Sequence, residues 1–407
     1  MYKTCQNNLN PYLLSYSEKL ILIWICSSIK SLPDVSGHLI LRIPAIQLEF
    51  YGGFGILLQA TSGFVMNPGR DMLNGNHWGN PGMVLKKVEK ELSRFKKRLF
   101  YSGKVHKELE RALFRLQNMP YELYDKIRND GLCIQTPQIK TIDETLDKIL
   151  KEKCSLCRFG DGEFVLMEGG RINYQQRSAQ LARRLKEVLT SDKPNLLIGL
   201  PPCFGNLEHF LPPVADFWRK WASRKRETIY SYLDMDRVYY DAFFSRAYIQ
   251  DYKTDEHYKK CGDYYKKIRM LWADRSVVIC EGQGTRFGMF NDLLEGAETV
   301  SRILCPAHSA FDKYDEILAA FDDVSREKLI LAALGPTATV LAYDLCNKGY
   351  QAIDIGALDV DYEWFLRKET ELGVPLEHKY VDSGKKGRKI RPLQDPEYKK
   401  QILREIR

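Results

Sequence analysis

The sequence predicts an α/β fold in which a mostly parallel sheet carries helices on both faces. Short runs of apolar and β-branched residues recur at 155–160, 195–200, 228–233, 276–282, 301–306, 328–335 and 351–358. Between the later runs lie segments with helical patterns, at 290–299, 311–324 and 336–349. Strands that alternate with helices of about 10–15 residues indicate βαβ units, and therefore a Rossmann-like parallel sheet.

The chain before these units divides into two further parts. Residues 1–80 mix β-branched residues with glycines and show no helical period, so the sequence leaves their fold unclear. Residues 81–140 are predicted to be a helical connector, because their apolar residues follow amphipathic i, i+3/i+4 spacing at 84, 85, 88, 92, 95 and 99. Thr141 and Glu144 form a capping-box pattern that starts a domain predicted over 141–380. A basic tail is expected over 381–407.

The positive charge of the chain is concentrated in two segments. The 61 Lys+Arg and 53 Asp+Glu give a net charge of +8, of which 86–115 carries +7 and 384–407 carries +6. The rest is mildly acidic, which argues against nucleic acid as a partner and favours solvated basic faces or peripheral contact with an anionic membrane. The longest apolar run, 20–26, is shorter than the ~20 residues that span a bilayer. We therefore expect a cytoplasmic protein, with peripheral attachment to the inner face of the membrane as an alternative.

The first candidate site is the segment RFGDGE, which follows a predicted strand. Gly160 and Gly162 flank Asp161 and allow a tight turn, so that Asp161 and Glu163 can point the same way, beside Arg158. Two carboxylates spaced by one residue suit a hard divalent cation, with phosphate oxygens and water completing its coordination shell. This pattern makes Asp161 and Glu163 candidate ligands of Mn²⁺ or Mg²⁺.

Two other acidic pairs have the same spacing. Asp234 and Asp236 follow an apolar run, as the DxD of a GT-A glycosyltransferase would, and Asp359 and Asp361 do likewise. A DxD match is a weak signal, and spacing alone does not choose among the three pairs.

Two loops have the composition of phosphate sites. A strand that ends at Glu281 enters a glycine-rich loop containing Thr285 and Arg286, and a helix is predicted to follow. Backbone N–H groups at a helix start, together with an Arg side chain, bind phosphate or carboxylate. The second loop joins the strand near 333 to a helix, and its turn consists of Gly335, Pro336 and Thr337.

Further carboxylates end or follow the predicted strands. Asp354 can hold a pair of ribose or sugar hydroxyls. Glu281 and Glu363 are candidates for a general base, and the sequence does not rank them.

Taken in order, the motifs resemble the GT-D fold glycosyltransferases, a bacterial family first catalogued as a domain of unknown function. The resemblance runs over about 143–365 and rests on RFGDGEF, YQQRSAQLARRL, DAFFSRAY, EGQGTRFGMFNDLL, CPAHSAFDKYDEIL, ALGPTATVLAYDL and GYQAIDIGALDVDYEWF. It implies that the family's DxE metal motif falls on Asp161 and Glu163. Ala357 stands where many members have His. Other positions match the family pattern: Gln175, Arg246, Glu281, Arg286, Gly335 and Thr337.

The resemblance implies a metal-dependent transfer of a sugar, glucose or a related hexose, from a UDP-sugar to a glycan or glycoprotein in surface glycan biosynthesis. The diphosphate leaving group would be neutralised by Mn²⁺ or Mg²⁺ and by Arg side chains. Two alternatives remain open at this point, a metal-dependent nuclease or phosphoesterase and an inactive nucleotide-binding module. Residues 51–69 also resemble a piece of a hexapeptide-repeat acyltransferase without its repeats or catalytic His, which implies a remnant within 1–80. The sequence does not give the oligomeric state.

Overall fold

The computed structural model describes three short strands within 39–60 and then residues 103–131, 134–381, 390 and 392–407, with side chains from residue 107 onward. The chain divides into two compact units, 1–97 and 98–407, which are described separately. In the first unit, β1 (Leu39–Ile43), β2 (Ile46–Tyr51) and β3 (Gly55–Ala60) form an antiparallel sheet. Most of the segment that resembles an acyltransferase lies outside the described residues.

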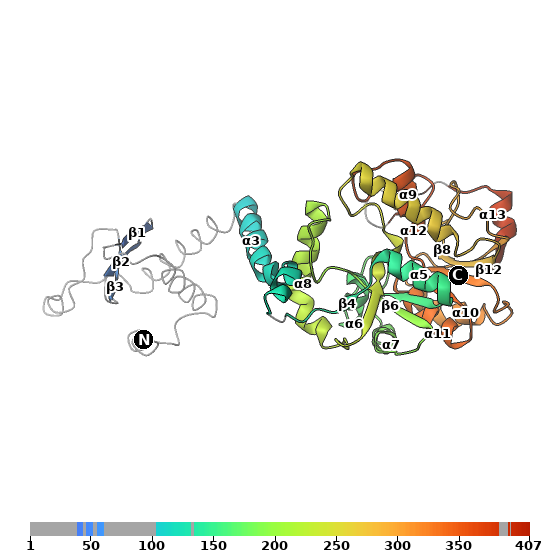
Figure 1. The fold of residues 1–407 in the computed structure, drawn as a ribbon, viewed down its shortest axis with the longest axis horizontal. Coiled ribbons are helices and arrows are strands. Elements are labelled where there is room, and N and C mark those ends of the chain that lie inside the picture. The colour runs from blue at the N-terminus through green and yellow to red at the C-terminus, as the bar shows by residue number, and fades with distance from the viewer. Residues whose placement is uncertain are drawn as a thin grey trace, which may run out of the picture. The chain divides into compact units, whose positions relative to one another are not determined.

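The second unit contains a nine-stranded sheet in the order β12-β9-β8-β10-β11-β5-β6-β7-β4 (Figure 1). Every neighbouring pair in it is parallel. This confirms the predicted fold class. Its strands are β4 (Gln138–Ile139), β5 (Ser155–Arg158), β6 (Leu196–Leu200), β7 (Val238–Asp241), β8 (Ser276–Gly282), β9 (Thr299–Cys305), β10 (Leu329–Ala333), β11 (Ala352–Asp354) and β12 (Ile402–Glu405).

Helices cover both faces of this sheet. Buried residues of α6, α7, α8, α10 and α11 form one core with the sheet, and those of α5, α9 and α12 form the other. The helical elements are α3 (Gly103–Glu122), α4 (Tyr124–Asn129), α5 (Ile142–Glu152), α6 (Asp161–Met167), α7 (Ala179–Leu189), α8 (Pro212–Tyr230), η1 (Ala242–Ser245), α9 (Asp255–Arg269), η2 (Ala310–Lys313), α10 (Tyr314–Ala319), α11 (Pro336–Asn347), α12 (Leu358–Leu366) and α13 (Pro396–Gln401).

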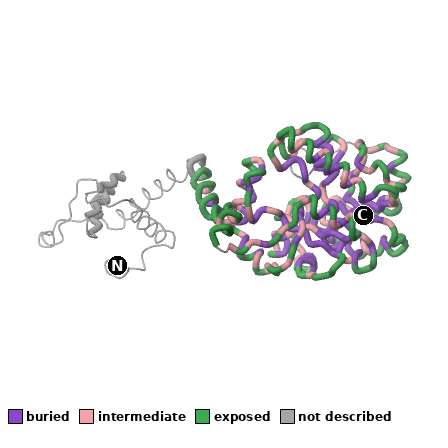
Figure 2. The backbone as a smooth tube through the Cα atoms, in the orientation of Figure 1, coloured by how far each residue is buried: buried purple, intermediate pink, exposed green. Residues whose placement is uncertain are grey.

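Alternate side chains of the apolar strands enter the two cores on opposite faces of the sheet. In β8, Val277 and Ile279 enter the core with α5, α9 and α12, whereas Val278 and Cys280 enter the core on the opposite face. Successive side chains of a strand point to opposite faces, so a strand covered on both sides must be apolar throughout. Figure 2 shows the buried residues concentrated within this unit, while α3 at its periphery is largely exposed.

Two predicted elements are wrong. The run 228–233, predicted as a strand, is the end of α8 and a following turn, because Trp218, Ala222 and Ile229 recur at helical spacing and are buried together; the strand comes later, as β7. The helix predicted over 290–299 is a series of turns up to the start of β9. There the Asn291 side chain accepts a hydrogen bond from the Leu293 N–H at 3.0 Å, a local bond that competes with helix formation.

The C-terminal residues are part of the domain, contrary to the expected basic tail. From 392 onward the chain forms α13 and then β12, which pairs with β9 at the edge of the sheet. The composition of this segment is basic, but Tyr398 and Ile406 are buried. Likewise α3, predicted as connector, lies in the second unit and packs on α8. Among the described helices, none combines the length and the hydropathy needed to cross a membrane.

Candidate active site

The predicted site residues follow strands whose carboxyl ends meet at one edge of the parallel sheet. Asp161 and Glu163 open α6 directly after β5, Asp354 ends β11, and Arg246 follows η1 after β7. In open α/β sheets ligands bind at this edge. The order of the sheet places β11, β5, β6 and β7 side by side, so these four residues come from one contiguous part of it.

Arg158 and Asp354, both predicted to bind substrate, instead bind each other. Arg158 donates from Nη2 to Asp354 Oδ1 at 2.8 Å and from Nε to the Asp354 carbonyl at 2.7 Å, and its Nη1 donates to Ser245 Oγ at 2.7 Å and to the Ala242 carbonyl at 3.0 Å. Gly356 has φ +51, and a Cβ there would lie 1.9 Å from Arg158 Nη2. The Arg158 guanidinium therefore links the end of β5 to the end of β11 and to the turn that follows β7, and holds these segments together.

Asp161 and Glu163 form the open part of the site. Glu163 Oε2 accepts the Gly160 N–H at 2.7 Å, which closes the first turn of α6 and leaves Oε1 without a partner among the described residues. Asp161 is exposed as a residue, but its carboxyl group is partly desolvated and accepts from the N–H groups of Asp161 itself and Gly162; Glu163 is half-buried. Burial, followed by the nearby charges of Asp354 and Asp161, raises the pKa of Glu163 to about 7, although the Gly160 hydrogen bond opposes the shift. Poorly solvated carboxylates placed close together favour binding of a cation.

Arg246 is the positive charge of this part of the site. Burial raises the pKa of Asp161, and the nearby Arg246 guanidinium opposes that shift. Arg246 is half-buried, and none of the described residues accepts a hydrogen bond from its side chain or forms an ion pair with it. All of its donors are therefore left for a ligand. Because an Arg presents a planar set of donors, it suits the oxygens of a phosphate.

The carboxylate pair fits a metal that keeps ligands from outside the protein. Among the residues that the structure describes, no group of three or more His, Cys, Asp or Glu side chains is arranged to hold an ion. An ion at Asp161 and Glu163 would therefore take the rest of its coordination shell from water and from a bound phosphate. Mg²⁺ typically binds through one or two carboxylates together with substrate phosphates, and the oxygen-only donor set also suits Mn²⁺.

The start of α11 is only partly open to a ligand. Gly335 has φ +55, and a Cβ at this position would lie 2.4 Å from Cε2 of Tyr174, so the ring packs directly on the glycine. Thr337 is fully buried, and its hydroxyl has no hydrogen-bond partner. Gln175 is buried as well, with Nε2 donating to the Gln176 carbonyl at 3.3 Å. In this conformation Gln175 and Thr337 do not face solvent, and Pro336 begins the helix as predicted.

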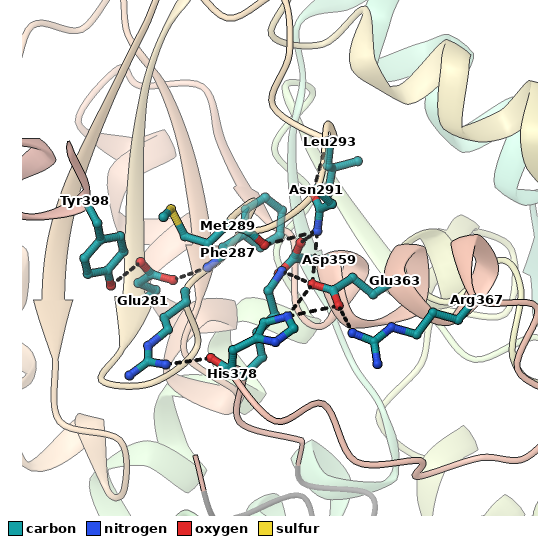
Figure 3. A network of polar contacts seen from close by, with 12 residues as sticks. Glu281, Phe287, Met289, Asn291, Leu293, Asp359, Glu363, Arg367, His378 and Tyr398 are labelled. Atoms are coloured by element: carbon teal, nitrogen blue, oxygen red, sulfur yellow. Dashed lines mark hydrogen bonds and ion pairs between the residues drawn. The ribbon is translucent and has the colours of Figure 1, made fainter. Parts of the chain in front are cut away.

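Glu281, predicted as a possible base, is bound on both carboxylate oxygens inside the protein (Figure 3). Oε1 accepts from Arg302 Nη1 at 2.6 Å and from the Tyr398 hydroxyl at 3.1 Å, and Oε2 accepts from the Phe287 N–H at 2.7 Å. Burial raises the pKa of Glu281, and the Arg302 charge opposes the shift. The side chain is fully buried. Glu281 therefore joins β8, β9, α13 and the loop after β8, and in this conformation neither of its oxygens is available as a base.

Glu363 is likewise enclosed, in the second part of the network in Figure 3. Its Oε1 lies 2.7 Å from Lys379 Nζ, and its Oε2 lies 3.0 Å from Arg367 Nη2 and 3.3 Å from His378 Nε2. The Glu363 side chain is 4% exposed and that of Lys379 is fully buried. These partners leave Glu363 no free oxygen with which to take a proton from a substrate.

Arg286 and Thr285 lie in a loop that no helix follows, so the predicted anion site at a helix start is absent from the described loop. Thr285 N–H donates to the Gly282 carbonyl at 2.9 Å. Arg286 has φ +52, is buried, and donates from Nη1 to the His378 carbonyl at 2.8 Å. Arg286 therefore holds the segment around His378 and is not shown in contact with the Asp161 pair.

Neither alternative acidic pair forms an open carboxylate pair at the carboxyl edge of the sheet. Asp361 accepts the N–H groups of Tyr248 and Ile249 at 2.9 and 3.1 Å and is buried. Asp359 is buried and paired with Lys379. The remaining two, Asp234 and Asp236, are exposed and precede β7, which puts them at the amino end of the sheet.

Sequence reasoning missed the residues that enclose the two glutamates. Arg302, Lys379 and Tyr398 are buried polar side chains in segments that read as ordinary strand, loop or tail. Their partners lie between 16 and 117 residues away in the chain. Arg302 alone gave a signal, since a charge within a short apolar strand requires a partner.

The comparisons with known proteins give the family. The model of the glycosyltransferase GT-D fold matches residues 156–383, more than half of the chain, and the chain belongs to that family. It is 33% identical over 309 residues to a probable glycosyl transferase, Gly, of Streptococcus gordonii, covering 74% of this chain and 44% of that protein. It is 34% identical over 270 residues to the glycosyltransferase GlyD of Streptococcus pneumoniae serotype 4, covering 66% of this chain and 32% of that protein. The chain thus spans less than half the length of these relatives.

Solved structures agree with this assignment. The structure of a conserved domain of unknown function 1792, described as having a distinct glycosyltransferase fold, is 35% identical with a TM-score of 0.63, covering 67% of this chain and 96% of that one. A glycosyltransferase of the same domain from Streptococcus sanguinis is 33% identical with a TM-score of 0.62, covering 67% of this chain and 100% of that one.

Proposed function

We propose that this protein transfers a hexose, glucose or a close relative, from a UDP-sugar to a glycan or glycoprotein acceptor, with a divalent metal bound at Asp161 and Glu163. The observation that carries the proposal is the group at the carboxyl edge of the sheet: two carboxylates near the guanidinium of Arg246, none of which forms an ion pair with a described side chain. Membership of the GT-D family supports sugar transfer as the reaction. The donor, the metal and the acceptor are parts of the proposal.

The chain's own residues supply two functions in this proposal. Asp161 and Glu163 hold the metal, and Arg246 binds the diphosphate of the donor from the side, which limits its movement and offsets charge on the leaving UDP. A bound Mn²⁺ or Mg²⁺ would act as a Lewis acid that stabilises negative charge on the diphosphate. The internal pair of Arg158 and Asp354 holds the loops that carry these groups.

The structure bears on which residue could act as the general base. With Glu281 and Glu363 enclosed, the carboxylates left at the open edge are Asp161 and Glu163, which the proposal assigns to the metal. We therefore assign no protein base, and the reaction is proposed to depend on positioning and charge stabilisation.

The experiment is a UDP-release assay with the purified chain, a panel of UDP-hexoses and Mn²⁺ or Mg²⁺, in the presence and absence of EDTA. The proposal expects release that requires the metal and is fastest with one hexose. A matched incubation with single-stranded and double-stranded nucleic acid tests the nuclease alternative. Metal-dependent cleavage of nucleic acid without UDP release would replace the proposal, and UDP binding without release would favour an inactive module.

Peripheral attachment to an anionic membrane at the cytoplasmic face remains a separate proposal, supported by the two basic segments of the sequence. Deletion of 384–407 is not a clean test, because it removes α13 and β12. Substitution of Lys385, Lys386, Arg388 and Lys389 by Gln changes charge alone. If the proposal holds, these changes reduce co-sedimentation with phosphatidylserine vesicles at low salt, since each basic residue contributes on the order of 1 kcal/mol. Unchanged co-sedimentation of the quadruple variant contradicts it.

A further inference from the structure

Several polar and charged residues of α3 contact α8 of the same domain. Glu110 Oε1 lies 3.0 Å from Arg224 Nη2, and Glu122 Oε1 lies 2.6 Å from Arg219 Nε, with both arginines on α8. Asn118, which is 1% exposed, donates to the Arg219 carbonyl at 2.9 Å. The face of α3 that packs on the domain therefore combines these polar contacts with one buried ring, Phe114, whereas a surface helix ordinarily buries most of its apolar residues.

The opposite face of α3 is apolar and exposed. The exposed fractions are 65% for Leu109, 53% for Leu113, 64% for Leu116 and 48% for Met119. Leu109, Leu113 and Leu116 are separated by four and then three residues, which places them on one stripe of the helix. Leu123, just past the end of α3, continues the stripe and is 36% exposed. We call these leucines the α3 stripe; exposure of such apolar side chains to water carries a substantial free-energy cost.

The sequence repeats the same spacing upstream of α3. Apolar residues at 85, 88, 92, 95 and 99 alternate by three and four, and 99 and 113 are two heptads apart, as are 95 and 109. The α3 stripe is thus in register with the upstream repeat, which is interrupted by Ser102 and His106, and by Pro120 between Leu116 and Leu123. A heptad repeat of apolar residues sustained over several heptads is typical of coiled coils.

We propose that the α3 stripe is a dimerisation surface whose partner is the same stripe on a second copy of this chain. Among the residues that flank the stripe, Ala112, Gln117 and Met119 carry no charge, and Glu110 is paired with Arg224 of its own domain at 3.0 Å. Two identical helices can therefore pair here without like-charge repulsion, while a strongly basic or acidic partner would find no complementary charges beside the leucines. Pairing of one patch with itself is the usual arrangement of a two-fold dimer.

The test is the molar mass of the full-length chain, measured by light scattering after size-exclusion chromatography across a range of micromolar concentrations. Two variants address the stripe: Leu109→Gln/Leu113→Gln/Leu116→Gln and the corresponding triple Ala variant, which keeps high helix propensity. The matched control changes three exposed apolar residues away from α3 to Gln: Met270, Leu366 and Leu372. Circular dichroism of each protein reports whether the fold is kept.

The proposal expects a dimer for the wild-type chain and for the control, a monomer for the Gln variant, and a dissociation constant at least tenfold higher for the Ala variant. A monomeric wild-type chain overturns it, because the stripe would then be covered by the chain itself or by another molecule. A dimer that persists in both stripe variants also overturns it. Flotation with anionic vesicles is measured in parallel: a monomeric chain that floats, and ceases to float in the Gln variant, would assign the stripe to a membrane.

Discussion

Two pairs of acidic residues at the same sheet edge have opposite surroundings. Asp161 and Glu163 form no ion pair with a described side chain, and a guanidinium without a partner of its own lies near them. Glu281 and Glu363 are saturated with hydrogen bonds and ion pairs from the protein itself (Figure 3). Both kinds follow or end strands in the sequence, yet only the first kind is available to a substrate or a metal.

This difference separates the carboxylates that stabilise the fold from those that can bind a metal or a substrate. Removing one member of a buried ion pair leaves its partner's charge buried and uncompensated, which is strongly destabilising. Removing an open carboxylate exposes no such charge, so the fold is preserved while the ability to hold a cation is lost. Each prediction below uses this difference.

The largest effect is expected for Asp161→Ala and Glu163→Ala. If these residues hold the catalytic metal, each change lowers turnover in the UDP-release assay by roughly 10,000-fold or more, ~5.4 kcal/mol in the barrier. The free energy of unfolding should remain close to wild type for Asp161→Ala. It should fall by about 1 kcal/mol for Glu163→Ala, which also loses the hydrogen bond to Gly160. Asp234→Ala is the control and should retain turnover. Loss of activity in Asp234→Ala with retention in Asp161→Ala would reverse the assignment.

Glu281→Ala should mainly destabilise the protein. Arg302 is 1% exposed and would be left without its carboxylate, and breaking a buried pair costs about 3–5 kcal/mol. Urea unfolding measures this loss. The conservative Glu281→Gln keeps the shape of the side chain and one acceptor oxygen, and should recover part of the stability. A stable Glu281→Ala protein that has lost turnover would return Glu281 to the catalytic residues.

Arg246 and Arg286 show the same contrast between an open and an enclosed side chain. Arg246→Ala should weaken binding of UDP by about 1.5–3 kcal/mol, the range for hydrogen bonds to charged groups, and Arg246→Lys should recover only part of it. Arg286→Ala is the matched variant: because Arg286 donates to the His378 carbonyl, its loss should lower stability more than affinity for UDP. Calorimetric titration with UDP measures the affinity of each variant, and urea unfolding measures its stability. Equal affinities for wild type and Arg246→Ala would remove Arg246 from the diphosphate site.

A smaller effect is expected from Asp241, a buried carboxylate at the end of β7. Burial raises its pKa to about 7, although the hydrogen bond from the Phe243 N–H opposes the shift. The folded state therefore keeps a proton that the unfolded chain releases near pH 4, so this group's contribution to stability falls as pH rises from about 4 to 7. Asp241→Asn removes that dependence, and its stability relative to wild type should improve by at least about 1.4 kcal/mol between pH 5 and pH 8. A pH-independent difference in urea unfolding would contradict the assignment.

The parts of the fold that depend on local pattern could be predicted from the sequence. The run at 276–282 alternates between the two cores and formed β8, and the capping box at Thr141 and Glu144 starts α5 as expected. The helix expected at 290–299 failed because the Asn291 side chain bonds to the nearby backbone, and β12 was missed because a short strand within a basic segment resembles a tail.

The candidate site also has features set by local sequence and features set by distant contacts. Asp161 and Glu163 were found because glycines and acids adjacent in the chain define the turn that presents them. The enclosure of Glu281 could not be predicted, because its partners, Arg302 and Tyr398, are 21 and 117 residues away, and only the folded sheet shows that they reach it. Whether a carboxylate is open or enclosed depends on such distant contacts.

Binding of Mn²⁺ in the presence of UDP, followed by electron paramagnetic resonance of the free ion, tests the central claim most directly. The account predicts that the wild-type chain and the Glu281→Gln variant remove Mn²⁺ from solution with a stoichiometry of about one ion per chain, on the basis of one open carboxylate pair able to hold a divalent ion. It predicts that the double variant Asp161→Asn/Glu163→Gln does not bind the ion at the same concentrations. Binding that persists in the double variant, or is lost in Glu281→Gln while that protein stays folded, would contradict the account.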